Sequence, residues 1–155
     1  GLNIYLEYKN FDLTMFWQGV QGVDVISDLK KETDLWSGLN IGFLNKGKRV
    51  LDAWSPTNPN STIPALSRSD TNNEKRVSTY FVENGSFLKL RNIQLGYNVP
   101  KNFAQKMKME RLRFYLSAQN VFTIKSKEFT GVDPENANYG YPIPMNITFG
   151  INVGF

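Results

Sequence analysis

The sequence of 155 residues contains no cysteine and no histidine. Without cysteine there is no disulfide framework and no thiolate ligand for a metal or a redox reaction. Without histidine the chain lacks the commonest general base and the commonest zinc ligand. No catalytic constellation is found among the remaining residue types, so the sequence predicts that the chain is not an enzyme.

Long apolar runs and clustered basic residues are missing as well. No segment approaches the roughly 18 consecutive apolar residues of a membrane-spanning helix, and no signal peptide is recognisable. The 18 Lys and Arg residues are scattered among 14 Asp and Glu residues, which gives a formal net charge of +4. Because this charge is not gathered into a basic run or a nucleic-acid-binding module, we expect no nucleic-acid partner.

The segment from Met145 to Phe155 has a strict pattern. Every second residue is apolar, and the residues between are small or polar. This period of two predicts a strand with one apolar and one polar face. Its eleven residues match the length of a tilted strand that crosses a bilayer. The apolar positions are Ile147, Phe149, Ile151, Val153 and Phe155.

Four more segments alternate in the same way and are predicted to be strands. In the third of them the pattern slips, because Leu88 and Leu90 share one parity whereas Ile93 and Leu95 share the other. A β-bulge near Arg91-Asn92 would bring all of these side chains to one face. The five predicted strands span residues 2–8, 11–19, 86–99, 111–122 and 145–155.

A tight turn is predicted between the first two strands. The apolar residues change from even to odd positions across Lys9-Asn10, which a two-residue hairpin requires if one face is to stay apolar. This register places Tyr8 opposite Phe11, and it also pairs Leu6 with Leu13, Ile4 with Met15 and Leu2 with Trp17. Asn10 is expected to supply the left-handed conformation that such turns demand.

The charged residues of these strands all lie on the face opposite the apolar one. A charge that faces lipid in mid-membrane costs about 2–4 kcal/mol, whereas a water-filled lumen accepts it. A soluble β-sandwich would carry its charged face outside, so alternation alone leaves both readings open. Three features favour a membrane-spanning sheet over a soluble β-sandwich. They are the strand length, the asymmetry of the loops and the aromatic residues at the strand ends. The residues expected to face the lumen or an internal plug are Tyr5, Glu7, Phe16, Arg111, Arg113 and Tyr115.

The connections between the strands alternate between short and long. Residues 9–10 and 100–110 are short connections, whereas 20–85 and 123–144 are long. Outer-membrane barrels have short periplasmic turns and long outer loops, which predicts a carboxyl terminus on the periplasmic side. Within the first long loop, residues 20–29 could extend a strand or form a short helix.

Five strands are too few for a closed barrel, because the smallest barrels have about eight. The chain also begins abruptly, inside an alternating segment. We therefore expect an all-β fold, an antiparallel transmembrane β-barrel segment that belongs to a longer protein.

The long loops contain candidate contacts for a lid protein or a substrate, because aromatic side chains bind sugar rings and anchor protein interfaces. Ordinary loop packing is the alternative for each of them. Asp133 and Glu135 form an acidic pair that we expect to structure its loop, with a calcium site as the alternative. No other cofactor is expected. The four aromatic candidates are Trp36, Trp54, Tyr139 and Tyr141.

Six stretches carry a further signal when they are taken in order: Tyr8–Gly19, Trp54–Asn60, Gly85–Pro100, Leu112–Thr123, Gly131-Val-Asp-Pro-Glu135 and the terminal Phe155. Together they resemble the carboxyl-terminal end of SusC/RagA-type TonB-linked outer-membrane proteins of Bacteroidetes. The resemblance covers essentially the whole chain. Each stretch alone is weakly specific, whereas the ordered set is specific.

The resemblance implies a barrel of about 22 strands with an internal plug. Such proteins import large nutrients, often oligosaccharides and sometimes peptides. A SusD-type surface lipoprotein caps the barrel, and the TonB–ExbB–ExbD complex supplies energy. The plug domain and the TonB box are absent from this chain, so we expect energy coupling to reside outside it.

The terminal aromatic residue resembles the signal that the barrel-assembly machinery reads on outer-membrane proteins. We expect Phe149, Ile151, Val153 and Phe155 to form this assembly signal. The alternative for Phe155 is one member of an interface girdle of aromatic residues.

The predicted function is therefore part of a TonB-dependent outer-membrane importer, to which the chain supplies barrel wall, outer loops and assembly signal. Two alternatives remain. One is a passive or structural outer-membrane barrel, and the other is a soluble all-β binding module. The sequence does not name the transported substrate.

Overall fold

The computed structural model describes residues 1–35, 45–67, 73–74, 76–137 and 140–155. These residues form two compact units. The sheet unit comprises residues 1–21, 86–125 and 143–155, and the loop unit comprises residues 22–85 and 126–142.

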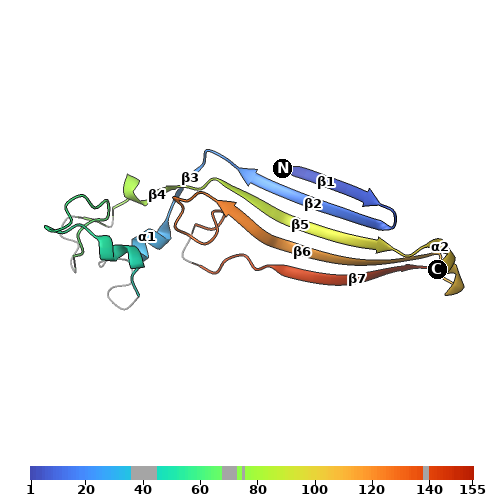
Figure 1. The fold of residues 1–155 in the computed structure, drawn as a ribbon. Coiled ribbons are helices and arrows are strands. Elements are labelled where there is room, and N and C mark those ends of the chain that lie inside the picture. The colour runs from blue at the N-terminus through green and yellow to red at the C-terminus, as the bar shows by residue number, and fades with distance from the viewer. Residues whose placement is uncertain (36–44, 68–72, 75, 138–139) are drawn as a thin grey trace. The chain divides into compact units, whose positions relative to one another are not determined.

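The sheet unit is a single antiparallel sheet of five strands, which confirms the all-β fold class (Figure 1). The strands run in the order β1-β2-β5-β6-β7 across the sheet. Each consecutive pair is antiparallel, and β1 and β7 form the two edges, so the sheet is not closed. The strands are β1 (Leu2–Tyr8), β2 (Phe11–Val20), β5 (Phe87–Asn98), β6 (Arg111–Lys125) and β7 (Asn146–Gly154).

The hairpin between β1 and β2 has the register that the change of parity predicts. Tyr8 pairs with Phe11, and the ladder continues to Leu2 opposite Trp17. The prediction for the turn residue was wrong, because Lys9 takes the left-handed conformation, with φ 55°, and Asn10 does not. One left-handed residue is enough for some two-residue turns, and the chain uses its first position.

The bulge predicted near Arg91-Asn92 is confirmed. The pairing of β5 with β6 shifts between Leu90 and Asn92. Across this shift Leu90 pairs with Trp17 of β2, and Ile93 pairs with Met15. The apolar residues on both sides of the slip therefore lie on one face of the sheet.

The apolar face of the sheet is open over much of its area. Leu6 is 55% exposed, Leu116 is 50% exposed and Phe149 is 65% exposed. On the polar face, Asp12 is only 6% exposed, whereas Tyr5 is 61% exposed. Much of the apolar face is thus uncovered, whereas in a soluble sheet the apolar face is the covered one.

The short connection between β5 and β6 contains helix α2 (Lys101–Lys106). The Met109 amide donates to the carbonyl of Ala104, and the Lys108 amide donates to that of Gln105. These two bonds form a Schellman motif, in which the residue after the cap is left-handed and is usually glycine. Here that residue is Lys108, with φ 59°, at a local cost of about 1–2 kcal/mol.

The segment between β2 and β5 is not a structureless loop. Of residues 20–29, Val20 ends β2, the next strand begins at Asp24, and a short helix begins at Asp28. Ser27 caps this helix, since its hydroxyl accepts from the Lys30 amide at 3.3 Å. The elements of the loop unit are β3 (Asp24–Ile26), α1 (Asp28–Thr33), η1 (Lys48–Asp52), η2 (Thr79–Phe81) and β4 (Val82–Asn84), with β3 paired to β4.

Among the described residues, no helix has the length and apolar character needed to cross a membrane.

Candidate functional site

The polar face of the sheet contains a buried ion pair between strands that are far apart in sequence. Arg113 of β6 donates to both carboxylate oxygens of Asp12 in β2, with Nε–Oδ2 at 3.1 Å and Nη2–Oδ1 at 2.5 Å. Asn98 of β5 donates a third hydrogen bond to Oδ2 at 3.0 Å. The two charged side chains are only 13% and 8% exposed. The cluster therefore ties three strands together on the face predicted to line the lumen.

Glycines make room for the side chains of this face. A Cβ at Gly96 would lie 2.3 Å from Nη2 of Arg113 and 2.5 Å from the carboxylate of Asp12. A Cβ at Gly150 of β7 would lie 2.2 Å from the ring of Tyr115. The ion pair therefore lies next to the backbone of Gly96, and the tyrosine ring lies next to that of Gly150, because neither glycine has a side chain in the way.

The other residues predicted to face the lumen are distributed along the same face. Tyr5 is 61% exposed, and its hydroxyl donates to Glu7 at 3.2 Å. Phe16 is half-buried and Arg111 is exposed. Arg113 also lies over the ring of Tyr115, with Cζ 5.7 Å from the ring centroid. Only Arg113 of the predicted set takes part in the buried cluster with Asp12.

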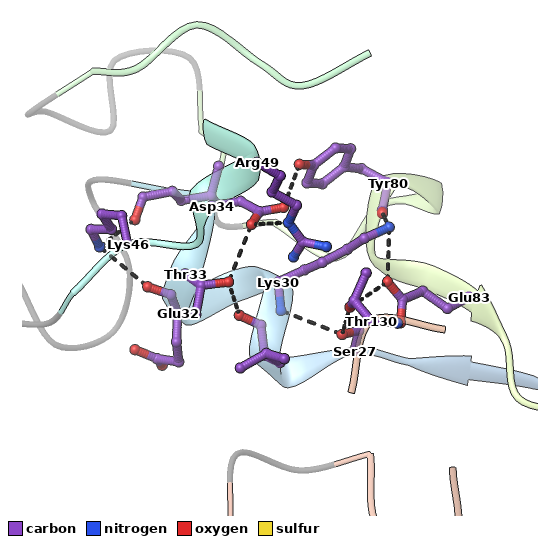
Figure 2. Close-up of polar contacts among 12 residues, drawn as sticks. Ser27, Lys30, Glu32, Thr33, Asp34, Lys46, Arg49, Tyr80, Glu83 and Thr130 are labelled. Atoms are coloured by element: carbon purple, nitrogen blue, oxygen red, sulfur yellow. Dashed lines mark hydrogen bonds and ion pairs between the residues drawn. The ribbon is translucent and has the colours of Figure 1, made fainter. Parts of the chain in front are cut away.

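The loop unit has a second buried carboxylate cluster, centred on Asp34 (Figure 2). Arg49 donates from Nε to Oδ1 at 2.5 Å, and Tyr80 donates from its hydroxyl to Oδ2 at 2.6 Å. Thr33 adds a hydrogen bond at 3.2 Å. The side chain of Asp34 is fully buried. Burial and the bond to Asp34 raise the pKa of Tyr80 well above its ordinary value.

A third carboxylate, Glu83 of β4, joins separate stretches of the loop unit. It accepts from the amide and the hydroxyl of Thr130, at 2.9 and 2.7 Å. Lys30 of α1 lies 3.1 Å from its Oε1. Burial raises the pKa of Glu83, but the bonds from Thr130 and Lys30 outweigh it, and the net pKa lies below the ordinary value.

The folded structure of the loop unit is therefore expected to lose stability in acid. Because the folded-state pKa of Glu83 is lowered, its contribution is present above the ordinary pKa of 4.5 and is lost as the pH falls through the folded-state value. Limited proteolysis of the loops between pH 7 and pH 3 measures this change. The protease should cleave the Glu83→Gln variant faster than the wild type at neutral pH, and its cleavage rate should rise less as the pH falls. The exposed control Glu128→Gln should be cleaved like the wild type at every pH. An unchanged acid profile in Glu83→Gln would contradict the assignment.

Two of the four predicted loop aromatics can be placed. Trp54 is 43% exposed and Tyr141 is 96% exposed. Trp36 and Tyr139 lie outside the described residues. Tyr141 lines a cavity of about 420 Å³ in the loop unit, together with Leu29, Val132, Pro142, Asp133, Asn136 and two glycines.

The acidic pair of this loop stabilises a turn. The Glu135 amide donates to Oδ1 of Asp133 at 3.1 Å, and the Asn136 amide donates to the Asp133 carbonyl at 3.0 Å. Asp133 is buried whereas Glu135 is exposed. Within the described residues, no group of three or more acidic side chains is arranged to hold a metal ion.

The predicted assembly signal lies on the edge strand β7. Phe149 is 65% exposed and Phe155 is 84% exposed. Ile151 and Val153, on the same face, are 51% and 44% exposed. The terminal residue lies at the end of the sheet that carries α2 and the β1–β2 turn (Figure 1).

Sequence reasoning missed the pairing of Asp12 with Arg113 and all of the Asp34 cluster. The first could have been found, because the registers across β2, β5 and β6 bring position 12 near position 113. The second carries no local signal, since residues 34, 49 and 80 lie in segments without periodicity.

Comparison with known proteins adds a relationship over the whole chain. No family model matches the sequence. The chain is 33% identical over 171 aligned residues to "TonB-dependent receptor P3" of Formosa agariphila, and 31% identical over 163 to "TonB-dependent receptor SusC" of Bacteroides thetaiotaomicron. Both alignments include the entire chain, which spans only 16% of the first relative and 15% of the second.

Solved structures give the same result. One described as the "RagAB peptide transporter" is 30% identical with a TM-score of 0.72. Another, the "RagAB peptide importer in the 'closed-closed' state", is 28% identical with a TM-score of 0.75. Each superposition includes 96% of this chain and 16% of the other.

Proposed function

Because the chain belongs, as one segment, to the TonB-dependent receptors of the SusC and RagA type, we propose that it forms part of the barrel wall and the outer loops of an outer-membrane importer. The importer would take up large nutrients, either oligosaccharides or peptides. The chain itself would carry out no chemical step.

The observation that carries this proposal is the division of the sheet into two unlike faces. The apolar face is exposed at Leu6, Leu116 and Phe149, at 50% or more. The opposite face holds the buried Asp12–Arg113 pair. A transmembrane barrel needs an apolar wall toward lipid and a polar lumen, and this sheet supplies both.

The orientation follows from the connections. The β1–β2 turn, α2 and the carboxyl terminus share one end of the sheet (Figure 1). The long connections leave β2 and β6 at their other ends, after Val20 and Lys125. Since outer-membrane barrels have short turns in the periplasm, we propose that α2 and the carboxyl terminus are periplasmic and that the loop unit is extracellular.

The partners are proposed from the family. A SusD-like surface lipoprotein would cover the extracellular side, and the TonB–ExbB–ExbD complex would act through a plug that lies outside this segment. Tyr141 and Trp54 are the candidate contacts for the lipoprotein or the substrate, because both are exposed on the loop unit. The carboxylate clusters around Asp34 and Glu83 would hold these loops in shape.

Affinity purification of the full-length receptor from detergent-solubilised outer membranes tests the proposal. We expect a surface lipoprotein to copurify, and we expect nutrient uptake to stop when TonB is deleted. Uptake that is independent of TonB would instead indicate a passive barrel. Recovery of the receptor in the aqueous fraction without detergent would contradict the membrane assignment.

Deletion of Phe155 from the full-length receptor is expected to lower its outer-membrane level severalfold, because the barrel-assembly machinery would lose the terminal aromatic residue. Immunoblotting of fractionated membranes measures this level. Tyr141→Ala removes another highly exposed aromatic side chain and is the matched control. Equal levels for the deletion and the control would show that Phe155 is no assembly signal.

A further inference from the structure

The periplasmic end of the sheet concentrates positive charge. Four basic side chains lie in the two short connections, and all four are exposed. Glu110 is the one acidic residue between positions 99 and 111. Within the described part of the chain, none of the four forms a salt bridge. We call them the basic rim: Lys9, Lys101, Lys106 and Lys108.

Exposed apolar side chains stand beside these charges. Phe103 of α2 is 60% exposed and Met107 is 49% exposed. Tyr8, next to the β1–β2 turn, is 71% exposed. Lysines combined with exposed aromatic and aliphatic side chains are typical of surfaces that lie at the boundary between lipid head groups and acyl chains.

The α2 connection contacts the strand that follows it. This helix packs on β6. Leu112 of β6 is only 8% exposed, whereas Leu116, on the same face of the same strand, is 50% exposed. The apolar face is therefore covered at the start of β6, next to the α2 connection, and open farther along the strand. This change in exposure supports a connection that turns toward the lipid side.

Two lysines of the rim occupy backbone positions that do not favour them. Lys9 has φ 55° and Lys108 has φ 59°, in the left-handed region that glycine adopts at the lowest cost. Glycine would suit both turns better, so the fold does not require lysine at either position. What lysine adds there is an exposed positive charge.

We propose that the basic rim binds the head groups of anionic phospholipids in the periplasmic leaflet of the outer membrane. The inference rests on the orientation proposed above. Positive charge complements the phosphate of a lipid such as phosphatidylglycerol, and flexible lysine side chains reach the head-group level while their stems lie along apolar surface. The exposed Phe103 and Met107 would enter the acyl boundary.

Native mass spectrometry of the purified full-length receptor, titrated with phosphatidylglycerol or with phosphatidylethanolamine, tests the proposal. The wild type is expected to prefer phosphatidylglycerol, and added salt should weaken the preference. Lys9→Gly with Lys108→Gly should reduce that affinity by about fivefold for each charge removed. The double variant should remain folded, because both substitutions relieve a left-handed backbone.

The matched control is Lys48→Gln with Lys127→Gln, which removes two exposed lysines from the loop unit. It should keep the wild-type lipid preference. Outer-membrane fractionation of each variant tests the proposed function separately. The lipid site would be overturned if the double variant reached the outer membrane and bound phosphatidylglycerol with the same affinity as the wild type. A selective loss of lipid A binding in the double variant would overturn it as well, because lipid A belongs to the opposite leaflet.

Discussion

Arg113→Ala is expected to destabilise the full-length receptor by about 3–5 kcal/mol, because it leaves the Asp12 carboxylate in the sheet without its cation. Asp12 is 6% exposed, and after the substitution only Asn98 would donate to it. The shift in the urea midpoint of the purified receptor measures this loss.

Arg111→Ala is the matched control for this substitution. Arg111 lies two residues away on the same strand and points to the same face, but it is exposed. Its replacement should change the stability by no more than about 0.5 kcal/mol. If the two variants unfolded at the same urea concentration, the ion pair would have no role in holding β2, β5 and β6 together.

Asp34→Ala is expected to loosen the loop unit by about 3 kcal/mol, because the substitution removes the common acceptor of Arg49 and Tyr80. A loss of this size raises the population of the opened loops by about a hundredfold. The rate of limited proteolysis at the loops of the intact receptor should rise accordingly, while the urea midpoint of the barrel should stay close to that of the wild type.

Asp24→Ala tests whether the effect is specific. Asp24 is an exposed carboxylate of β3 in the same unit, so its removal should leave the cleavage rate within about twofold of the wild type. Cleavage of Asp34→Ala at the wild-type rate would show that the cluster in Figure 2 does not stabilise these loops.

The sheet could be predicted from the sequence because its signals are local. Alternation defines a strand within a few residues, and the change of parity across Lys9-Asn10 sets the hairpin register. The slip near Arg91 marks the bulge in the same way. The left-handed residue of the hairpin is Lys9 and not Asn10, although residue preference favours asparagine.

The loop unit could not be predicted from the sequence because its contacts are long-range. Asp34 meets Tyr80 across 46 positions, and Glu83 meets Thr130 across 47. No periodicity connects such residues, and the helix that Ser27 caps has only six residues, which is too short to show a helical period. The aromatic candidates Tyr141 and Trp54 were found by residue type alone, and their contacts with a lid or a substrate stay a prediction.

The central claim is that the sheet is membrane wall, with lipid on one face and the lumen on the other. Spin labels placed one at a time along β7 in the full-length receptor, embedded in lipid, test it most directly. Collision with apolar oxygen should alternate with a period of two and be highest at positions 147, 149, 151 and 153, while the water-soluble nickel reagent should be excluded from them. Reversed preferences, or no alternation along β7, would contradict the assignment.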